Sequence, residues 1–366
     1  MNRSRAFVTL ATVGILVLSA CTTASPSAGE MTPVRVQLQW APQAQFAGYF
    51  AAKEKGYYAD EGLDVEIVPG GPDVIPQQVG SASNGPEFTI SWVPKVLEAR
   101  EAAEPSDLVD IAQIFQRSGT LSVSWKDSNI TEPADFAGKK VGVWDFGNEF
   151  EVTAAGRAVG LEEGTDYTKV IQPFDMTLLL SREIDVAEAM IYNEYAQVLE
   201  AENPDTGALY QPDDLNVIDY NEVGTAMLQD ALFARASWLA EEGNEEIAVK
   251  FLRATFRGWI YCRENAADCV TMVLAAGSTL GAGHQTWQLN EINALIWPSP
   301  DGIGQLDSGL WDQTVQIALD SGIIQAEPGD DAFRTDLATS ALEGISEDTK
   351  ATGFTKGTVE VTPGGE

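Results

Sequence analysis

Residues 34–69 read VRVQLQWAPQAQFAGYFAAKEKGYYADEGLDVEIVP, and their pattern indicates the class of fold. Apolar and polar residues alternate over 34–40, as they do in a half-buried strand. Pro42 interrupts that strand, and aromatic residues then recur at helical spacing until Gly56, a residue that commonly ends helices. A second alternating segment at 63–67 completes a strand–helix–strand unit. This stretch therefore predicts an α/β protein with a mostly parallel sheet.

The same alternation of strands and helices continues along the chain. Strands are predicted at 111–115, 121–125, 139–144, 215–220 and 225–235, and a further one ends in Met190-Ile191-Tyr192. Beyond Ser237 the pattern is mainly helical. Residues 346–366 are polar and rich in Thr, Gly and acidic residues, so we expect a disordered tail.

The composition excludes several classes of function. The chain has 366 residues, 44% of them hydrophobic, so most of it should fold. Its 22 Lys and Arg residues face 55 acidic residues, a net charge of −33, and such a chain should not bind nucleic acid. One histidine and three cysteines leave no pattern for a multi-histidine zinc site. We expect no metal and no cofactor.

The N-terminus has the features of an export signal. Arg3 and Arg5 precede the apolar run 6–18, and Leu18-Ser19-Ala20-Cys21 resembles a bacterial lipobox. This predicts a signal peptide at 1–20, acylation of Cys21, a flexible tether at 21–33, and a protein held outside the bacterial cell membrane by its lipid. The alternative is an ordinary signal peptide with a chance cysteine.

The other two cysteines are predicted to form a disulfide. In one continuous helix, Cys262 and Cys269 would lie about 10 Å apart, beyond the ~7 Å limit for a bridge. Asn265 and Asp268 offer a helix stop and restart between them. An oxidising compartment would then favour a bridge at a helix–turn–helix corner, and the alternative is two buried thiols.

The sequence lacks the common catalytic motifs. No dinucleotide or phosphate loop, HExxH or GxSxG motif occurs, so we expect a protein that is not an enzyme. The single histidine, His284, lies in a glycine-rich connection and is interpreted as a solvated or capping residue rather than a catalytic one.

Aromatic residues gather at the ends of predicted strands. Trp40, Trp92, Trp125, Trp144 and Tyr192 all stand at carboxyl ends, where open α/β sheets bind ligands. A tryptophan there offers a flat face for a planar ring, although each could instead close the core of its own domain, Trp125 above all.

The turn after Trp144 bears on the charge of the ligand. A strand end, a glycine-containing turn and a helix start occur at 144–150, a common place for an anion to meet backbone N–H groups. Asp145 and Glu149 would repel an anion, so a neutral or weakly basic ligand is expected. These acids could instead cap the helix.

Four segments resemble a known family. They are 40–52 (WAPQAQFAGYFAA), 55–67 (KGYYADEGLDVEI), 137–144 (AGKKVGVW) and 190–195 (MIYNEY). They are similar to the substrate-binding proteins of the thiamine-pyrimidine-synthase-like family, also called NMT1/THI5-like or SsuA/THI5, over residues 34–325. The resemblance implies a type II periplasmic-binding-protein fold, with one lobe formed by 34–121 and 223–345 and the other by 122–222.

The resemblance also implies a function and a site. The expected protein is a monomeric receptor of an ABC importer that captures a planar heterocycle, a thiamine pyrimidine precursor or riboflavin, and delivers it to a permease with a separate ATPase. The candidate ligand-binding residues are Trp40, Gln43, Phe46, Trp92, Trp144, Phe146, Asn148, Glu149, Tyr192, Asn193 and Glu194. Of these, Trp40, Trp92 or Trp144 would stack on the ring, while Gln43, Asn148, Asn193 and Glu194 would read its polar edge.

Two alternatives remain open within the resemblance. One is an extracytoplasmic pyrimidine-synthase-like enzyme, although the cysteine-rich iron motif and early histidine of that branch have no counterpart here. The other is a receptor for sulfonates or other aromatic compounds, and Asp145 and Glu149 argue against a sulfonate.

Overall fold

The computed structural model describes residues 31–366. The predicted signal peptide at 1–20, Cys21 and most of the predicted tether lie outside the described residues. The first strand begins at Thr32, so the predicted tether, which ends at residue 33, overlaps this strand by two residues.

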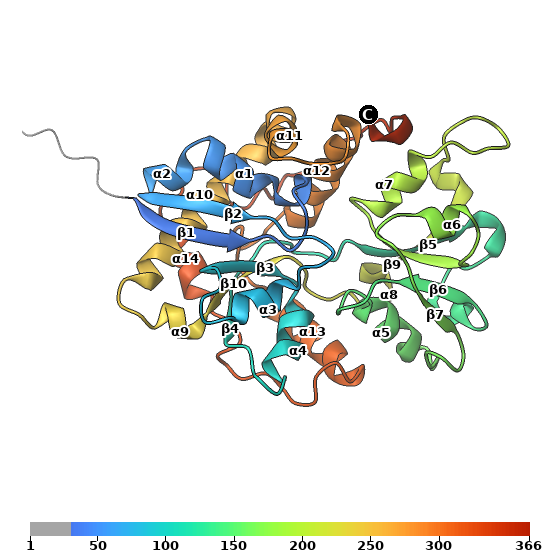
Figure 1. The fold of residues 1–366 in the computed structure, drawn as a ribbon, viewed down its shortest axis with the longest axis horizontal. Helices are drawn as coiled ribbons and strands as arrows, with labels where there is room; N and C mark the ends of the chain where they lie inside the picture. Colours follow the sequence, from blue (N-terminus) through green and yellow to red (C-terminus); the bar gives the residue numbers. More distant parts are fainter. Residues whose placement is uncertain (1–30) are drawn as a thin grey trace, which may run out of the picture. The chain divides into compact units, whose positions relative to one another are not determined.

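The described residues form two five-stranded sheets, in the orders β2-β1-β3-β10-β4 and β7-β6-β8-β5-β9 (Figure 1). We call the part of the molecule built on each sheet a lobe. The strands of the first lobe are β1 (Thr32–Gln37), β2 (Leu63–Val68), β3 (Phe88–Ser91), β4 (Leu108–Gln113) and β10 (Ala231–Arg235). Those of the second are β5 (Thr120–Trp125), β6 (Lys140–Val143), β7 (Thr168–Ile171), β8 (Val186–Met190) and β9 (Leu215–Asp219).

Helices connect and cover these strands. Those up to β10 are η1 (Ala44–Phe46), α1 (Ala47–Glu54), α2 (Tyr57–Asp60), α3 (Pro76–Ser81), α4 (Val93–Arg100), η2 (Lys126–Ser128), η3 (Pro133–Phe136), α5 (Phe150–Ala158), α6 (Thr177–Leu180), α7 (Glu194–Leu199), η4 (Pro212–Asp214) and α8 (Tyr220–Val223). After β10 come α9 (Ala236–Leu239), α10 (Asn244–Glu264), α11 (Ala266–Ala275), α12 (Ala282–Ile296), α13 (Ser308–Asp320), α14 (Asp336–Leu342) and η5 (Pro363–Gly365). The mainly helical C-terminal third is therefore confirmed.

Each sheet is mixed, because one of its strands runs against its neighbours. β10 is antiparallel to β3 and β4, and β5 is antiparallel to β8 and β9, while the other pairs are parallel. β5 and β10 are the first strands formed after the chain changes lobe, so they start where the neighbouring strands end. This arrangement brings the carboxyl ends of the parallel strands of both lobes to one cleft.

Two crossovers join the lobes. The chain leaves the first sheet after Gln113 and enters the second at Thr120, and it returns to the first between α8 and β10. Gln229 holds the crossovers together, since its Oε1 accepts from Gly119 N at 2.8 Å and its Nε2 donates to Thr120 Oγ1 at 2.6 Å. The predicted lobe boundary after residue 121 thus falls inside β5, and the one after residue 222 falls inside α8.

The C-terminal helices pack tightly onto the first lobe. Where α1 meets α10, a side chain on Gly258 would collide with the backbone oxygen of Gly48, so glycine allows the two helices to touch. At the other end of α10, the helix stops at Asn265 as predicted and α11 restarts at Ala266, two residues earlier than expected. The Cα atoms of Cys262 and Cys269 lie 5.5 Å apart at this corner, and their sulfurs are joined.

Residues 346–366 differ from the disordered tail that their composition predicts. Lys356 Nζ donates to Glu291 Oε2 at 2.9 Å, and Gly357 O accepts from Asn290 Nδ2 at 3.0 Å. Farther along, Gly364 N donates to Glu200 O at 3.0 Å. The segment makes these contacts through backbone and single polar side chains, which leave little hydrophobic signal in the sequence.

Candidate ligand-binding site

A pocket lies between the two lobes at the carboxyl ends of their parallel strands. Its free space is about 710 Å³, open mouth included. The first lobe lines it with Gln39, Trp40, Gln43, Gln45, Pro72, Val74, Ile75, Pro76, Gln77, Trp92 and Lys95. The second lobe contributes Trp144, Phe146, Asn148, Phe174, Met190, Tyr192, Asn193 and Glu194.

The structure brings together nine of the residues that the sequence singled out: Trp40, Gln43, Trp92, Trp144, Phe146, Asn148, Tyr192, Asn193 and Glu194. Phe46 lies elsewhere, fully buried in the core of the first lobe, because it belongs to the short helix η1, which packs against α11 and α12. Glu149 also lies outside the lining. Its carboxylate folds back to accept from Gly147 N at 3.0 Å, and burial raises its pKa.

Aromatic rings from both lobes meet in the pocket. The ring of Phe174 lies nearly parallel to that of Trp144, with 18° between their planes and 6.1 Å between their centroids. Its centroid lies 4.4 Å from that of Trp40 in the other lobe. The sequence interpretation missed Phe174, although it closely follows the carboxyl end of β7 and the strand-end rule could have found it. These three rings form a wall on which a planar ligand could stack.

Two of the predicted tryptophans, Trp92 and Trp125, already contact other residues of the protein. Lys95 Nζ covers the ring of Trp92 at 4.4 Å, and Trp92 Nε1 donates to Asp230 Oδ1 at 2.8 Å. Trp125 lies in the core of the second lobe and donates to Leu179 O at 2.9 Å, as its interpretation as a packing residue predicts. Since β5 is antiparallel to its neighbours, its carboxyl end points away from the cleft.

Lys95 and Asp230 are two buried charged residues that the sequence interpretation missed, and each influences the other electrostatically. Burial lowers the pKa of Lys95 to about 8 and raises that of Asp230 to about 6. Lys95 Nζ also donates across the cleft to Asn148 Oδ1 at 2.6 Å, while Gln45 Nε2 donates to Asp230 at 2.9 Å. The ammonium is therefore placed at the pocket surface, between the two lobes.

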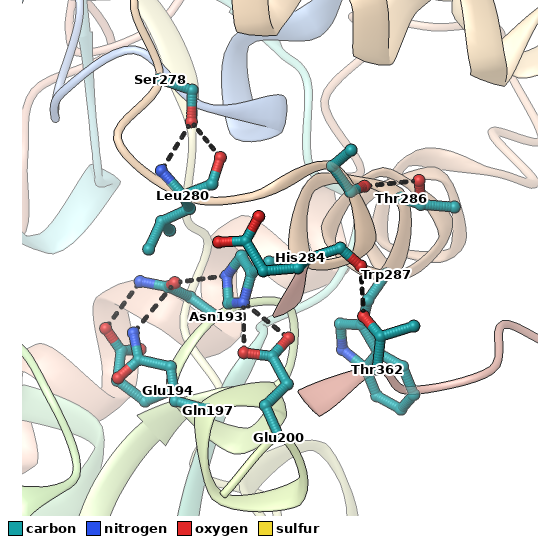
Figure 2. A network of polar contacts seen from close by, with 12 residues as sticks. Asn193, Glu194, Gln197, Glu200, Ser278, Leu280, His284, Thr286, Trp287 and Thr362 are labelled. Carbon is teal, nitrogen blue, oxygen red and sulfur yellow. Dashed lines mark hydrogen bonds and ion pairs between the residues drawn. The ribbon is translucent and has the colours of Figure 1, made fainter. Parts of the chain in front are cut away.

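Asn193 and Glu194 form the opposite polar wall. Glu194 accepts from Met190 N at 3.0 Å and from Asn193 Nδ2 at 2.7 Å, and burial raises its pKa to about 7. Asn193 precedes α7 but its side chain makes no helix-capping bond. It lies instead between Glu194 and His284 (Figure 2). His284 is 1% exposed, so the interpretation as a solvated or capping residue was wrong.

Several oxygens near the pocket are left without hydrogen-bond donors. Among the described residues, Gln39 Oε1 and Gln77 Oε1 are buried and unpartnered, and both residues line the pocket. A buried acceptor without a donor is costly, and a ligand with N–H groups would satisfy these two if the amides turned toward the pocket. At the mouth, Phe146 adopts φ 66° and is 65% exposed, a strained backbone of the kind found at binding sites.

Within residues 31–366, no cluster of three or more His, Cys, Asp or Glu residues could hold a metal ion. No helix in the same range has the length and apolar character needed to cross a membrane.

Two mixed α/β lobes joined by two crossovers, with a cleft at the strand ends, define a type II periplasmic-binding-protein fold. A family profile described as NMT1/THI5 like matches residues 43–268, more than half of the chain, and the protein belongs to this family.

Two relatives are solute-binding proteins by name. The formylaminopyrimidine-binding protein of Halalkalibacterium halodurans is 28% identical over 265 residues, 72% of this chain and 76% of that protein. The riboflavin-binding protein RibY of Chloroflexus aurantiacus is 24% identical over 348 residues, 87% of this chain and 93% of that protein. The Escherichia coli periplasmic aliphatic sulphonate binding protein SsuA shares the fold, with a TM-score of 0.57, 14% identity, and coverage of 81% of this chain and 89% of that one.

Proposed function

We propose that this protein is the extracytoplasmic receptor of an ABC importer and binds a planar amino-substituted heterocycle of the formylaminopyrimidine type between its lobes. The observation that carries the proposal is the composition of the pocket. It combines the aromatic wall of Trp40, Trp144 and Phe174 with the oxygen acceptors of Gln39, Gln77 and Glu194.

The acceptors favour an aminopyrimidine over riboflavin, the ligand of the other named relative. An aminopyrimidine presents exocyclic N–H donors on a single ring. The flavin ring system has one ring N–H and two carbonyl oxygens, and the other donors of riboflavin are hydroxyls on a flexible chain, so its ring edge offers fewer donors to the pocket's acceptors. Unpaired buried acceptors weaken binding of the wrong ligand.

The charges oppose a sulfonate ligand. Lys95 is the one cation among the described residues that line the pocket, and the acids Asp230 and Glu194 lie near it and on the opposite wall, respectively. Glu194 on the opposite wall would repel a sulfonate. The sequence interpretation based this expectation on Asp145 and Glu149, but neither residue lines the pocket. The acid that opposes a sulfonate is instead Glu194, which does line it.

Calorimetry on the protein spanning residues 22–366 tests the proposal. We expect formylaminopyrimidine to bind tightly and to be recovered with unchanged mass, as for a receptor rather than an enzyme. Riboflavin and an alkanesulfonate should bind at least about tenfold more weakly, because each leaves buried groups unpaired. A yellow protein that releases a flavin, or tight sulfonate binding, would contradict the proposal.

The receptor is proposed to be a monomer held at the outer face of the membrane by a lipid on Cys21, and to hand its ligand to a permease served by a separate ATPase. The lipobox-like segment supports the anchor. Labelling with a radioactive fatty acid should mark the wild-type protein, whereas Cys21→Ser should be unlabelled and released from the membrane.

A further inference from the structure

A buried polar network joins the two lobes beside the pocket (Figure 2). His284 is carried by α12, which packs with α11 and η1 of the first lobe, while Asn193 and Glu200 flank α7 of the second lobe. His284 Nδ1 lies 2.9 and 3.0 Å from the carboxylate oxygens of Glu200, and Nε2 lies 2.9 Å from Asn193 Oδ1. The imidazole therefore contacts an oxygen at each of its nitrogens.

These contacts define where the hydrogens lie. A carboxylate oxygen and an amide oxygen accept, so with Asn193 oriented as here the geometry favours a hydrogen on each nitrogen of His284. The orientation of the Asn193 amide has its own support. Asn193 Nδ2 donates to Glu194 Oε1 at 2.7 Å, and Gln197 Nε2 approaches Asn193 Oδ1 at 3.4 Å. A rotated amide would oppose two oxygens unless Glu194 carried a proton.

The network is closed off on its outer side. Gly364 N donates to Glu200 O at 3.0 Å, and a side chain at Gly365 would lie 2.8 Å from His284 Cβ. The charged groups around the ring are Glu200 and Glu194 from the α7 side and Glu366, next to Gly283, from the C-terminal segment. The carboxylate of Glu200 lies directly against the ring, where it would compensate a positive charge on the imidazole.

We propose that His284 is a positioning residue: it fixes Asn193, and through it Glu194, so that the Glu194 carboxylate selects ligands with an N–H donor. The inference rests on the proposed function and narrows its ligand class to heterocycles with an amino group. His284 does not line the pocket, so it acts through Asn193 and Glu194, which do.

The hydrogen positions can be observed without any ligand. Because the sequence has one histidine, a long-range ¹H–¹⁵N NMR spectrum of protein purified without a histidine tag reports on His284 alone. We expect both ring nitrogens to be protonated at neutral pH. A neutral ring with a bare Nε2 would overturn the proposal, because it requires the rotated amide and a protonated Glu194.

Ligand selectivity tests whether His284 acts on ligand choice through Asn193 and Glu194. The probes are formylaminopyrimidine and an analogue with a methyl group in place of the ring amino group. We expect the wild type to prefer the amino compound by at least about tenfold, and His284→Gln and Glu200→Gln to lose most of this preference while keeping the affinity for the methyl analogue. The exposed Glu202→Gln removes a neighbouring charge and should change neither value.

Two results would overturn the inference: variants that keep the preference, or variants that lose affinity for both probes equally, as a purely structural role would require. If His284→Gln does not fold, the result for Glu200→Gln decides between these outcomes, because glutamine keeps the shape of the glutamate side chain. A wild type that binds neither probe would overturn the proposed function and the selectivity built on it. The NMR spectrum then separates that failure from a failure of the network itself.

Discussion

Two bridges cross the cleft on different sides of the pocket, and their surroundings differ. Lys95 of the first lobe reaches Asn148 of the second from the pocket lining. His284 reaches Asn193 from behind the lining, with both of its nitrogens engaged.

This difference indicates that the two bridges have different roles in ligand binding. The Lys95 ammonium has three hydrogens and lies at the pocket surface, so it can turn toward a ligand carbonyl. Both nitrogens of His284 contact protein oxygens, so this bridge can hold one wall of the site but is not open to the ligand itself. We therefore expect the Lys95 bridge to rearrange when a ligand binds, and the His284 bridge to keep the wall of the site in place.

The largest effect on ligand affinity is expected from removing part of the aromatic wall of the pocket. Trp144→Ala should weaken formylaminopyrimidine binding well beyond tenfold, because stacking of a base on an aromatic ring contributes about 1–3 kcal/mol and the wall with Phe174 is lost. Calorimetry measures the change. Trp125→Phe, in the core of the second lobe, is the matched control. Unchanged affinity in a folded Trp144→Ala protein would remove Trp144 from the site.

Lys95→Met should break the bridge that responds to ligand. The methionine keeps much of the side-chain volume, and affinity should fall about tenfold if the ammonium donates to the ligand. Burial lowers the pKa of Lys95 to about 8, so wild-type affinity should be full below pH 8 and fall as the pH rises through it. Titrating both proteins by calorimetry checks this, and a fall that persists in Lys95→Met would assign it to another group.

The contribution of Glu194 to ligand affinity should depend on pH in the opposite sense. Burial raises the pKa of Glu194 to about 7, and only its ionised form accepts from ligand N–H groups without offering a proton. Affinity should therefore be full above pH 7 and decrease severalfold as the pH falls through it. Glu194→Gln should remove this acidic limb while leaving the limb near pH 8. The comparison also removes any contribution from titration of the ligand, which both proteins share.

The sequence contains enough information for much of the cleft. Trp40, Trp144 and Tyr192 stand at strand ends, and the alternating apolar pattern locates strand ends well. The rule that ligands bind at carboxyl ends then brings these residues together without knowledge of their distances.

Other parts of the site depend on contacts between distant segments. Lys95 and Asp230 are separated by more than a hundred residues, and nothing local marks them as partners. His284 is similar, since its glycine-rich surroundings indicate a surface loop and its acceptors come from the other lobe. Trp92 lines the pocket as predicted, but the sequence does not show that Lys95 already covers its ring. Phe46 lies in the core instead, because helical periodicity does not say which aromatic residues face the pocket.

The smallest effect on the cleft should come from the corner between α10 and α11. Reducing the Cys262–Cys269 bridge, or Cys262→Ser with Cys269→Ser, frees a short loop and should cost about 2 kcal/mol of stability, or about 3 °C in Tm. Neither Cys262 nor Cys269 lines the pocket, so ligand affinity and both pH limbs should stay as in the wild type. Calorimetric melting with and without reductant measures the shift. An unchanged Tm would show that the two thiols are not bonded, and a changed pH profile would show that the two bridges depend on the stability of the first lobe rather than on their own contacts.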